Sequence, residues 1–118
     1  MRICIDIDGT ICSIRESHQT YSEVTPLKGA AEKIRELKEK GYYIILSTAR
    51  HMKSCDSNVG QVIAREGLTL LEWLKQHDFV YDEIWFGKPY AHVYIDDRAL
   101  KFDGHWEFLE EEVIKNYL

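Results

Sequence analysis

The chain alternates between short apolar runs and longer segments in which apolar residues recur every three or four positions. Residues 2–7 alternate around β-branched side chains and residues 42–46 form a continuous apolar run, so both predict buried strands. Residues 84–86 and 93–95 are two further short strand candidates. Strands separated by helical segments are typical of a parallel sheet covered on both faces. We therefore expect an α/β, Rossmann-like three-layer sandwich with a parallel sheet of about four or five strands.

Three segments between and after these strands have helical spacing. A helix is predicted over 26–40, with Thr25 as its N-cap and proline at its first position. A capping-box pattern at Thr69 predicts a second helix over 69–77, and a short helix over 59–66 is an option before it. A C-terminal helix is expected to present one apolar face, made up of Trp106, Leu109, Val113 and Tyr117.

Length and composition place the chain among ordinary globular domains. Its 118 residues, 45% hydrophobic and 30% charged, predict one domain over 1–118. No apolar run approaches the roughly 18 residues that a membrane span requires, so no membrane contact is expected. Carboxylates interrupt the first apolar stretch, unlike a signal peptide, and we expect a cytoplasmic protein. Cys4 lies within that stretch and is interpreted as a reduced core residue.

The net charge of −5 gives little reason to expect a nucleic-acid surface, which would normally show a basic stripe. The reactive side chains instead gather directly after the predicted strands. In open parallel sheets, ligands bind beyond the carboxyl ends of the strands. The residues that follow the successive apolar runs are Asp6, Asp8 and Thr10, then Ser47 and Thr48, then Lys88, and finally Asp96 and Asp97.

Asp6 and Asp8 form a pair of carboxylates that needs a compensating charge. They lie two positions apart at a strand end and repel each other unless a cation or a shared proton intervenes. Oxygen ligands suit a hard cation, so Mg²⁺ is the predicted cofactor, with Asp96 or Asp97 completing its site. A carboxylate beside Mg²⁺ can attack phosphorus, and Lys88 would stabilise the negative charge on the phosphoryl group.

Four ordered motifs then carry a family resemblance. The Asp6–Thr10 block matches the DxDGT signature of the haloacid dehalogenase superfamily of phosphatases, and three later blocks are similar to those of the superfamily. These later blocks are Ile45-Leu46-Ser47-Thr48-Ala49-Arg50, Gly87-Lys88-Pro89 and Tyr94-Ile95-Asp96-Asp97-Arg98. The resemblance implies a small phosphorylated substrate that is hydrolysed with Mg²⁺ through an aspartyl-phosphate.

The resemblance also implies a role for each site residue. Asp6 is the nucleophile and a metal ligand, and Asp8 is the acid/base with its backbone carbonyl on the metal. Lys88 steadies the nucleophile and the phosphate. Phosphate binding is assigned to Thr48, or to Ser47 if the strand ends one residue earlier, together with Gly9 and Thr10. Asp96 carries the metal, and Asp97 is a ligand through water or supports the ligands.

Only about fifteen residues separate Thr10 from Pro26, which is enough for a flap but too few for the large cap domain of many family members. The chain thus resembles the cap-less group, and within it the small phosphatase-like proteins associated with capsular polysaccharide biosynthesis. That likeness favours a sugar phosphate or related metabolite. The Ile-Asp-Asp-Arg block is also similar to the phosphatase domain of polynucleotide kinase-phosphatases, which leaves a polynucleotide 3′-phosphatase as an alternative.

Three questions stay open at this point. A non-catalytic module that binds a phosphorylated ligand is the alternative from another class, although a binder needs neither a nucleophile nor an acid/base. The oligomeric state is undetermined, with a homo-oligomer as one option. Arg50 and Arg98 either pair with site carboxylates or bind substrate, and the sequence favours neither role.

Overall fold

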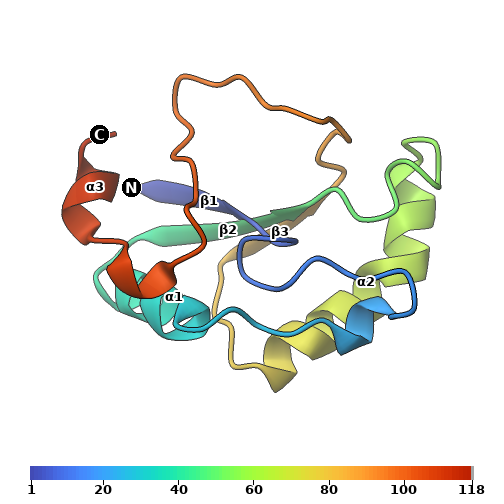
Figure 1. The fold of residues 1–118 in the computed structure, drawn as a ribbon, viewed down its shortest axis with the longest axis horizontal. Coiled ribbons are helices and arrows are strands. Elements are labelled where there is room, and N and C mark those ends of the chain that lie inside the picture. Colours follow the sequence, from blue (N-terminus) through green and yellow to red (C-terminus); the bar gives the residue numbers. More distant parts are fainter. Residues whose placement is uncertain (118) are drawn as a thin grey trace.

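The computed structural model describes residues 1–117 and contains a three-stranded parallel sheet in the order β1-β2-β3 (Figure 1). The strands are β1 (Arg2–Asp6), β2 (Tyr43–Thr48) and β3 (Glu83–Phe86). Parallel pairing sets Ile5 opposite Leu46, and Leu46 opposite Ile84, so these apolar side chains share one face. The predicted α/β class with a parallel sheet is confirmed.

Two helices, α1 (Ala30–Glu39) and α2 (Val59–Gln76), lie together on one side of the sheet (Figure 1). Strand-to-strand crossovers in parallel sheets are right-handed, and the strands here are added in one direction, so successive crossovers fall on the same face. The resulting core contains Ile5, Ile44, Leu46, Ala30, Ile34, Leu37, Leu70, Trp73 and Leu74. Two layers are therefore formed by the described residues where three were expected.

The opposite face of the sheet is far more open. Cys4 is exposed, which corrects the prediction that it is a core residue. Trp85 on β3 is 60% exposed, and its indole N–H donates to Glu83 at 2.6 Å. In Figure 1 the orange segment after β3 runs as a loop on the side of the sheet away from α1 and α2. This face lacks a packed helix among residues 1–117.

The predicted strand over 93–95 is wrong, and within residues 1–117 the sheet has three strands rather than four or five. Ile95 is 97% exposed. Local contacts hold this segment instead: the Tyr94 hydroxyl donates to the Pro89 carbonyl, and an Asp96 carboxylate oxygen accepts the Arg98 N–H at 2.8 Å. Turns built by the neighbouring polar residues take the place of strand pairing in this segment.

The first helix begins later than predicted, at Ala30 instead of Pro26. The preceding residues are tied to the loop after β1, because the Leu27 N–H donates to the Ile11 carbonyl at 2.9 Å. That loop is closed at a neck, where the Ser13 N–H donates to the Thr25 carbonyl at 2.8 Å. The Thr25 N–H returns a bond to the Ser13 hydroxyl at 3.0 Å. The loop contains a short 3₁₀ helix, η1 (Tyr21–Glu23).

The second helix is longer than predicted and runs without a break through Thr69. Its N-cap is Asn58, whose side chain accepts the Gln61 N–H at 3.1 Å. Asn58 caps the free N–H groups of a helix that begins at Val59, ten residues before the predicted start at Thr69. The capping-box pattern at Thr69 therefore lies in the helix interior. Residues 51–57, which precede this helix, form a series of turns.

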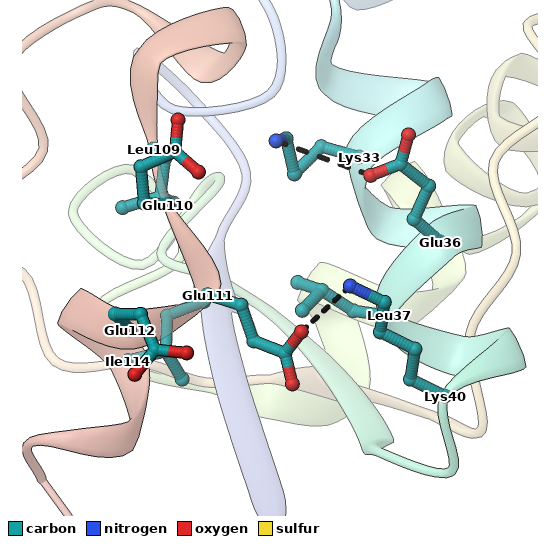
Figure 2. A pocket seen from close by; sticks show the side chains of 9 residues that line it. All are labelled: Lys33, Glu36, Leu37, Lys40, Leu109, Glu110, Glu111, Glu112 and Ile114. Carbon is teal, nitrogen blue, oxygen red and sulfur yellow. Dashed lines mark hydrogen bonds and ion pairs between the residues drawn. The ribbon is translucent and has the colours of Figure 1, made fainter.

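The C-terminal segment forms η2 (Trp106–Phe108) and the short helix α3 (Glu111–Lys115) rather than one long helix. The Trp106 indole donates to the Thr10 carbonyl at 2.6 Å. A cavity of about 260 Å³ separates this segment from α1, and Figure 2 shows the Lys40–Glu111 ion pair of 2.6 Å beside it. None of the helices described here has the length and apolarity to traverse a bilayer.

Candidate active site

The first strand ends in a tight turn that carries the two predicted carboxylates. The Ile7 N–H continues the pairing with β2 by donating to the Ser47 carbonyl at 3.0 Å. The chain then reverses, because the amides of Thr10 and Ile11 both donate to the Ile7 carbonyl, at 3.1 and 2.9 Å. Gly9 has φ +84°, and a Cβ there would lie 2.9 Å from the Ile14 side chain, so glycine is required.

Asp6 is paired with Lys88 across the end of the sheet. The Lys88 ammonium lies 3.2 Å from Asp6 Oδ1, and the Thr10 hydroxyl donates to Asp6 Oδ2 at 3.4 Å. The lysine follows β3 on a loop, whose first residues are fixed because the Lys88 N–H donates to the Thr48 carbonyl at 3.1 Å. Both side chains of the pair are partly exposed. The carboxylate that was predicted to be the nucleophile thus lies beside a cation and open to solvent.

Asp8 is held on one side by a buried arginine. Arg50 Nε lies 3.1 Å from each carboxylate oxygen of Asp8, and the Arg50 side chain is fully buried. The Thr48 hydroxyl donates to Asp8 Oδ2 at 3.2 Å. Arg50 therefore pairs with a site carboxylate rather than facing a ligand, whereas Arg98 lies exposed on the loop after β3.

The candidate phosphate-binding residues differ in accessibility. Thr48 is fully buried, and its hydroxyl also accepts the Arg50 N–H at 3.0 Å. Ser47 is partly exposed and lies opposite Asp6 in the β1–β2 register. The Gly9 N–H donates within the turn, to the Cys12 carbonyl at 2.9 Å. Phosphate binding by Thr48, Ser47, Gly9 and Thr10 stays a prediction.

Asp96 and Asp97 are exposed on the loop after β3 and do not join Asp6 and Asp8 in a cluster of possible metal ligands among residues 1–117. Across residues 1–117, three His, Cys, Asp or Glu side chains nowhere gather closely enough to hold a metal ion. The predicted ligand set is incomplete here because the segment that carries Asp96 does not pair with β1. The oxygen donors at Asp6 and Asp8 suit Mg²⁺ in kind but do not by themselves form its site.

The sequence prediction missed Glu66, which is buried behind Arg50. Glu66 Oε2 lies 3.3 Å from Arg50 Nη1, and the other oxygen, Oε1, lies 3.0 Å from His51 Nε2. Its signal was present in the sequence: Val62, Glu66 and Leu70 recur every four positions, which places a carboxylate within the apolar stripe of α2. Dividing this helix into two segments concealed that pattern.

Cys12 lies in the same group of side chains. Its thiol is 3.7 Å from Asp8 Oδ1, and it is buried. Burial, helped by the negative charge of Asp8, raises the pKa of the Cys12 thiol to about 12. Cys12 is therefore a protonated thiol at neutral pH and not a nucleophile.

A cavity of about 200 Å³ opens beside Asp8. It is bordered by the turn after β2 and by the loop closed at the Ser13–Thr25 neck, and it is lined by Asp8, Ile14, Arg15, Tyr21, Ala49 and Arg50. The Tyr21 ring lies between two guanidinium groups, 5.1 Å from that of Arg15 and 4.3 Å from that of Arg50. Asp8 is 22% exposed, so its carboxyl group is fixed from behind and accessible in front.

Comparisons with known proteins agree with this arrangement. A structural-genomics target from Vibrio cholerae is similar at 34% identity and a TM-score of 0.86, over 98% of this chain and 94% of that one. The D,D-heptose 1,7-bisphosphate phosphatase from B. bronchiseptica, solved with magnesium and phosphate, has 17% identity and a TM-score of 0.50. That alignment covers 72% of this chain and 48% of the phosphatase, and it supports the fold.

No curated protein matches the chain. A family model for haloacid dehalogenase-like hydrolases matches residues 3–98, which include all four motifs. The predicted superfamily and the predicted hydrolase class are confirmed by this match. The chain belongs to the haloacid dehalogenase-like hydrolase family.

Proposed function

We propose that the protein is a Mg²⁺-dependent phosphomonoester hydrolase that forms an aspartyl-phosphate on Asp6. The observation that carries this proposal is the Asp6–Lys88 pair, with Nζ 3.2 Å from Oδ1, at the carboxyl end of the sheet next to Asp8. A partly exposed carboxylate is available to attack phosphorus, and the adjacent ammonium favours the negative charge carried by the phosphoryl oxygens.

The two carboxylates divide the chemistry. An Asp6 oxygen forms a bond to phosphorus as the bond from phosphorus to the leaving oxygen breaks, and the leaving oxygen takes a proton from Asp8. Asp8 then accepts a proton from water, which attacks phosphorus and releases inorganic phosphate and free Asp6. The opening of the cavity next to Asp8 supports this division, since the leaving group has to lie against the acid.

Mg²⁺ is the proposed cofactor, and it would supply positive charge to the phosphoryl group when bound. Asp6 is the ligand best supported by the structure because its carboxylate is partly exposed at the strand end. Asp8, Asp96 and Asp97 are the further candidates from the motifs. The magnesium in the B. bronchiseptica phosphatase belongs to a protein of the same fold and agrees with this choice.

A phosphorylated sugar or related small metabolite is the proposed substrate. A cavity of about 200 Å³ beside the acid suits a compact leaving group. Arg15 lines this cavity, and over residues 1–117 it makes no ion pair with a carboxylate, which leaves its charge for a polar or anionic substituent. The heptose bisphosphate named for the B. bronchiseptica protein falls within this substrate class.

Hydrolysis of an aryl phosphate with Mg²⁺, with and without a chelator, tests the activity. Asp6→Asn is expected to lower kcat at least about a thousandfold because it removes the nucleophile. Asp78→Asn, at the far end of α2, is the matched control and should retain the wild-type rate. Equal turnover by Asp6→Asn, or full activity in chelator, would exclude the proposal. Phosphorylated sugars, nucleotides and 3′-phosphorylated oligonucleotides assayed side by side would then define the substrate.

A further inference from the structure

Arg50 is a fully buried cation that bridges two carboxylates from distant parts of the chain. Its Nε atom contacts both oxygens of Asp8 at 3.1 Å, and its Nη1 atom lies 3.3 Å from Glu66 Oε2. The Glu66 side chain is only 4% exposed. Burying such charges costs several kcal/mol for each ion, and well-packed apolar residues often stabilise a core as well or better. Stability alone therefore does not account for this group of charges.

The guanidinium plane is fixed from three directions. Asp8 lies at its Nε edge, Glu66 lies at Nη1, and the Tyr21 ring covers its face with the centroid 4.3 Å from Cζ. Glu66 is itself fixed by His51 Nε2, which lies 3.0 Å from Oε1. The described side chains leave no unsatisfied buried nitrogen or oxygen atoms. Arg50 is thus held in one orientation.

Asp8 receives these constraints on one side only. Arg50 and the Thr48 hydroxyl contact its two oxygens from the protein interior, while the remainder of the group borders the cavity. Because the Asp8 side chain is 22% exposed and lines this cavity, its carboxyl group is accessible to whatever occupies the cavity. Although Arg50 borders the cavity, its side chain has no exposed surface, so the guanidinium group is not available to bind a phosphate.

We propose that Arg50, held by Glu66, is a positioning residue that orients Asp8 for proton transfer to the leaving oxygen. This inference rests on the proposed function, in which Asp8 is the acid. Arg50 acts through its contacts with the Asp8 carboxyl group and has no place beside the phosphorus or the leaving oxygen. Misalignment of an acid affects the chemical step and not substrate binding, so its loss should lower kcat with little change in KM.

The dependence on leaving group distinguishes this role from a structural one. Phenyl phosphate needs a proton on its leaving oxygen, whereas dinitrophenyl phosphate departs without one. For Arg50→Lys we expect kcat on phenyl phosphate to fall about 10- to 100-fold, part of the roughly 100- to 10,000-fold range of acid catalysis. KM on phenyl phosphate should change less than about threefold. The same limit applies to kcat/KM on dinitrophenyl phosphate, because that quantity ends at departure of the leaving group and excludes the later hydrolysis step, in which Asp8 acts as a base. Glu66→Gln should show the same pattern with a smaller loss, and Arg35→Lys on α1 is the matched control.

A double-mutant cycle provides the decisive comparison. In an Asp8→Asn background, Arg50→Lys should no longer alter the ratio of the two rates, because the group that it orients has lost its proton. Equal losses of kcat/KM on both substrates, an effect confined to KM, or additive losses of kcat/KM in the cycle would overturn the inference. Thermal unfolding identifies a variant that fails to fold, and if Arg50→Lys does so, Glu66→Gln carries the test. Failure of the proposed function is seen separately, as wild-type activity that persists in Asp6→Asn.

Discussion

The face of the sheet that packs against α1 and α2 is closed, whereas the opposite face is largely open. Ile45 and Leu46 are neighbours in β2 and nearly equal in apolarity, yet Leu46 is fully buried and Ile45 is not. The difference arises because alternate side chains point to opposite faces and both helices cover the same one. Burial in this molecule is therefore decided by the direction of the crossovers and not by the apolarity of the strand.

The largest expected difference is in the rate at which cysteine thiols on the open face and in the core react with a labelling reagent. Of the three cysteines, Cys4 is exposed on the open face, while Cys12 and Cys55 are buried. Relative to a thiol with the ordinary pKa of 9.0, the Cys12 pKa of about 12 lowers the thiolate fraction about a thousandfold at neutral pH. Labelling of the native protein with an aromatic disulfide should modify one thiol rapidly.

Cys4→Ser is expected to abolish that fast phase and leave slow labelling governed by unfolding. If Cys12 reacted as quickly as Cys4 in the native state, the face described as closed would be open to reagent.

The free energy of unfolding should also depend on which face of the sheet a substituted side chain occupies. Leu46→Ala removes a fully buried side chain from the closed face and is expected to lower the free energy of unfolding by about 2–5 kcal/mol. Trp85→Ala removes a larger side chain that is mostly exposed, and its cost should stay below about 1 kcal/mol. Urea denaturation followed by circular dichroism measures both values. A larger loss for Trp85→Ala would mean that something packs on the open face in solution.

The smallest effect is expected where the C-terminal segment joins α1. Hydrogen bonds from Lys40 and then Tyr42, at 2.6 and 2.8 Å, lower the pKa of Glu111 from 4.5 to about 2. Because the folded-state pKa is depressed, the stabilisation is complete above pH 4.5 and is lost as the pH falls through 2. Glu111→Gln should therefore be less stable than the wild type at neutral pH, and the gap should close on acidification.

Glu112→Gln, one residue along the same short helix, is the comparison for that measurement. A gap between Glu111→Gln and the wild type that stayed constant down to pH 2 would contradict the assignment.

The sequence was sufficient to predict the parallel sheet and the pair formed by Asp6 and Lys88. Strand ends are marked by apolar runs followed by polar residues, and parallel strands bring those ends together. Which face of the sheet the helices cover was not predictable, because an apolar run such as residues 42–46 does not reveal which elements pack on it. The start of α1 was also misjudged, since Pro26 satisfies local helix rules while its neighbour Leu27 bonds to Ile11.

In the candidate site, too, some features could be predicted from the sequence and others could not. Asp6, Asp8 and Thr10 lie close together after β1 because few residues separate them and the turn is closed by its own backbone hydrogen bonds. Asp96 depended on a fourth strand, and the local turn at Arg98 formed in its place. Glu66 was missed because the helix was divided into two segments, which hid its place in the apolar stripe of α2, and its partner Arg50 lies 16 residues away in sequence. Contacts between residues that directly follow apolar strands can be predicted, as for Asp6 and Lys88, whereas contacts such as that of Arg50 with Glu66 require coordinates.

The neck between Ser13 and Thr25 has a consequence for how such a protein can diversify. Two hydrogen bonds clamp the base of residues 14–24 independently of what lies at the tip. Once the ends of a loop are held, doubling its length costs only about 0.6 kcal/mol in closure entropy. Related proteins can therefore vary the length and sequence of this segment at little cost in stability. Such changes would alter which molecules fit beside Asp8 and leave the sheet and the turn after β1 unchanged.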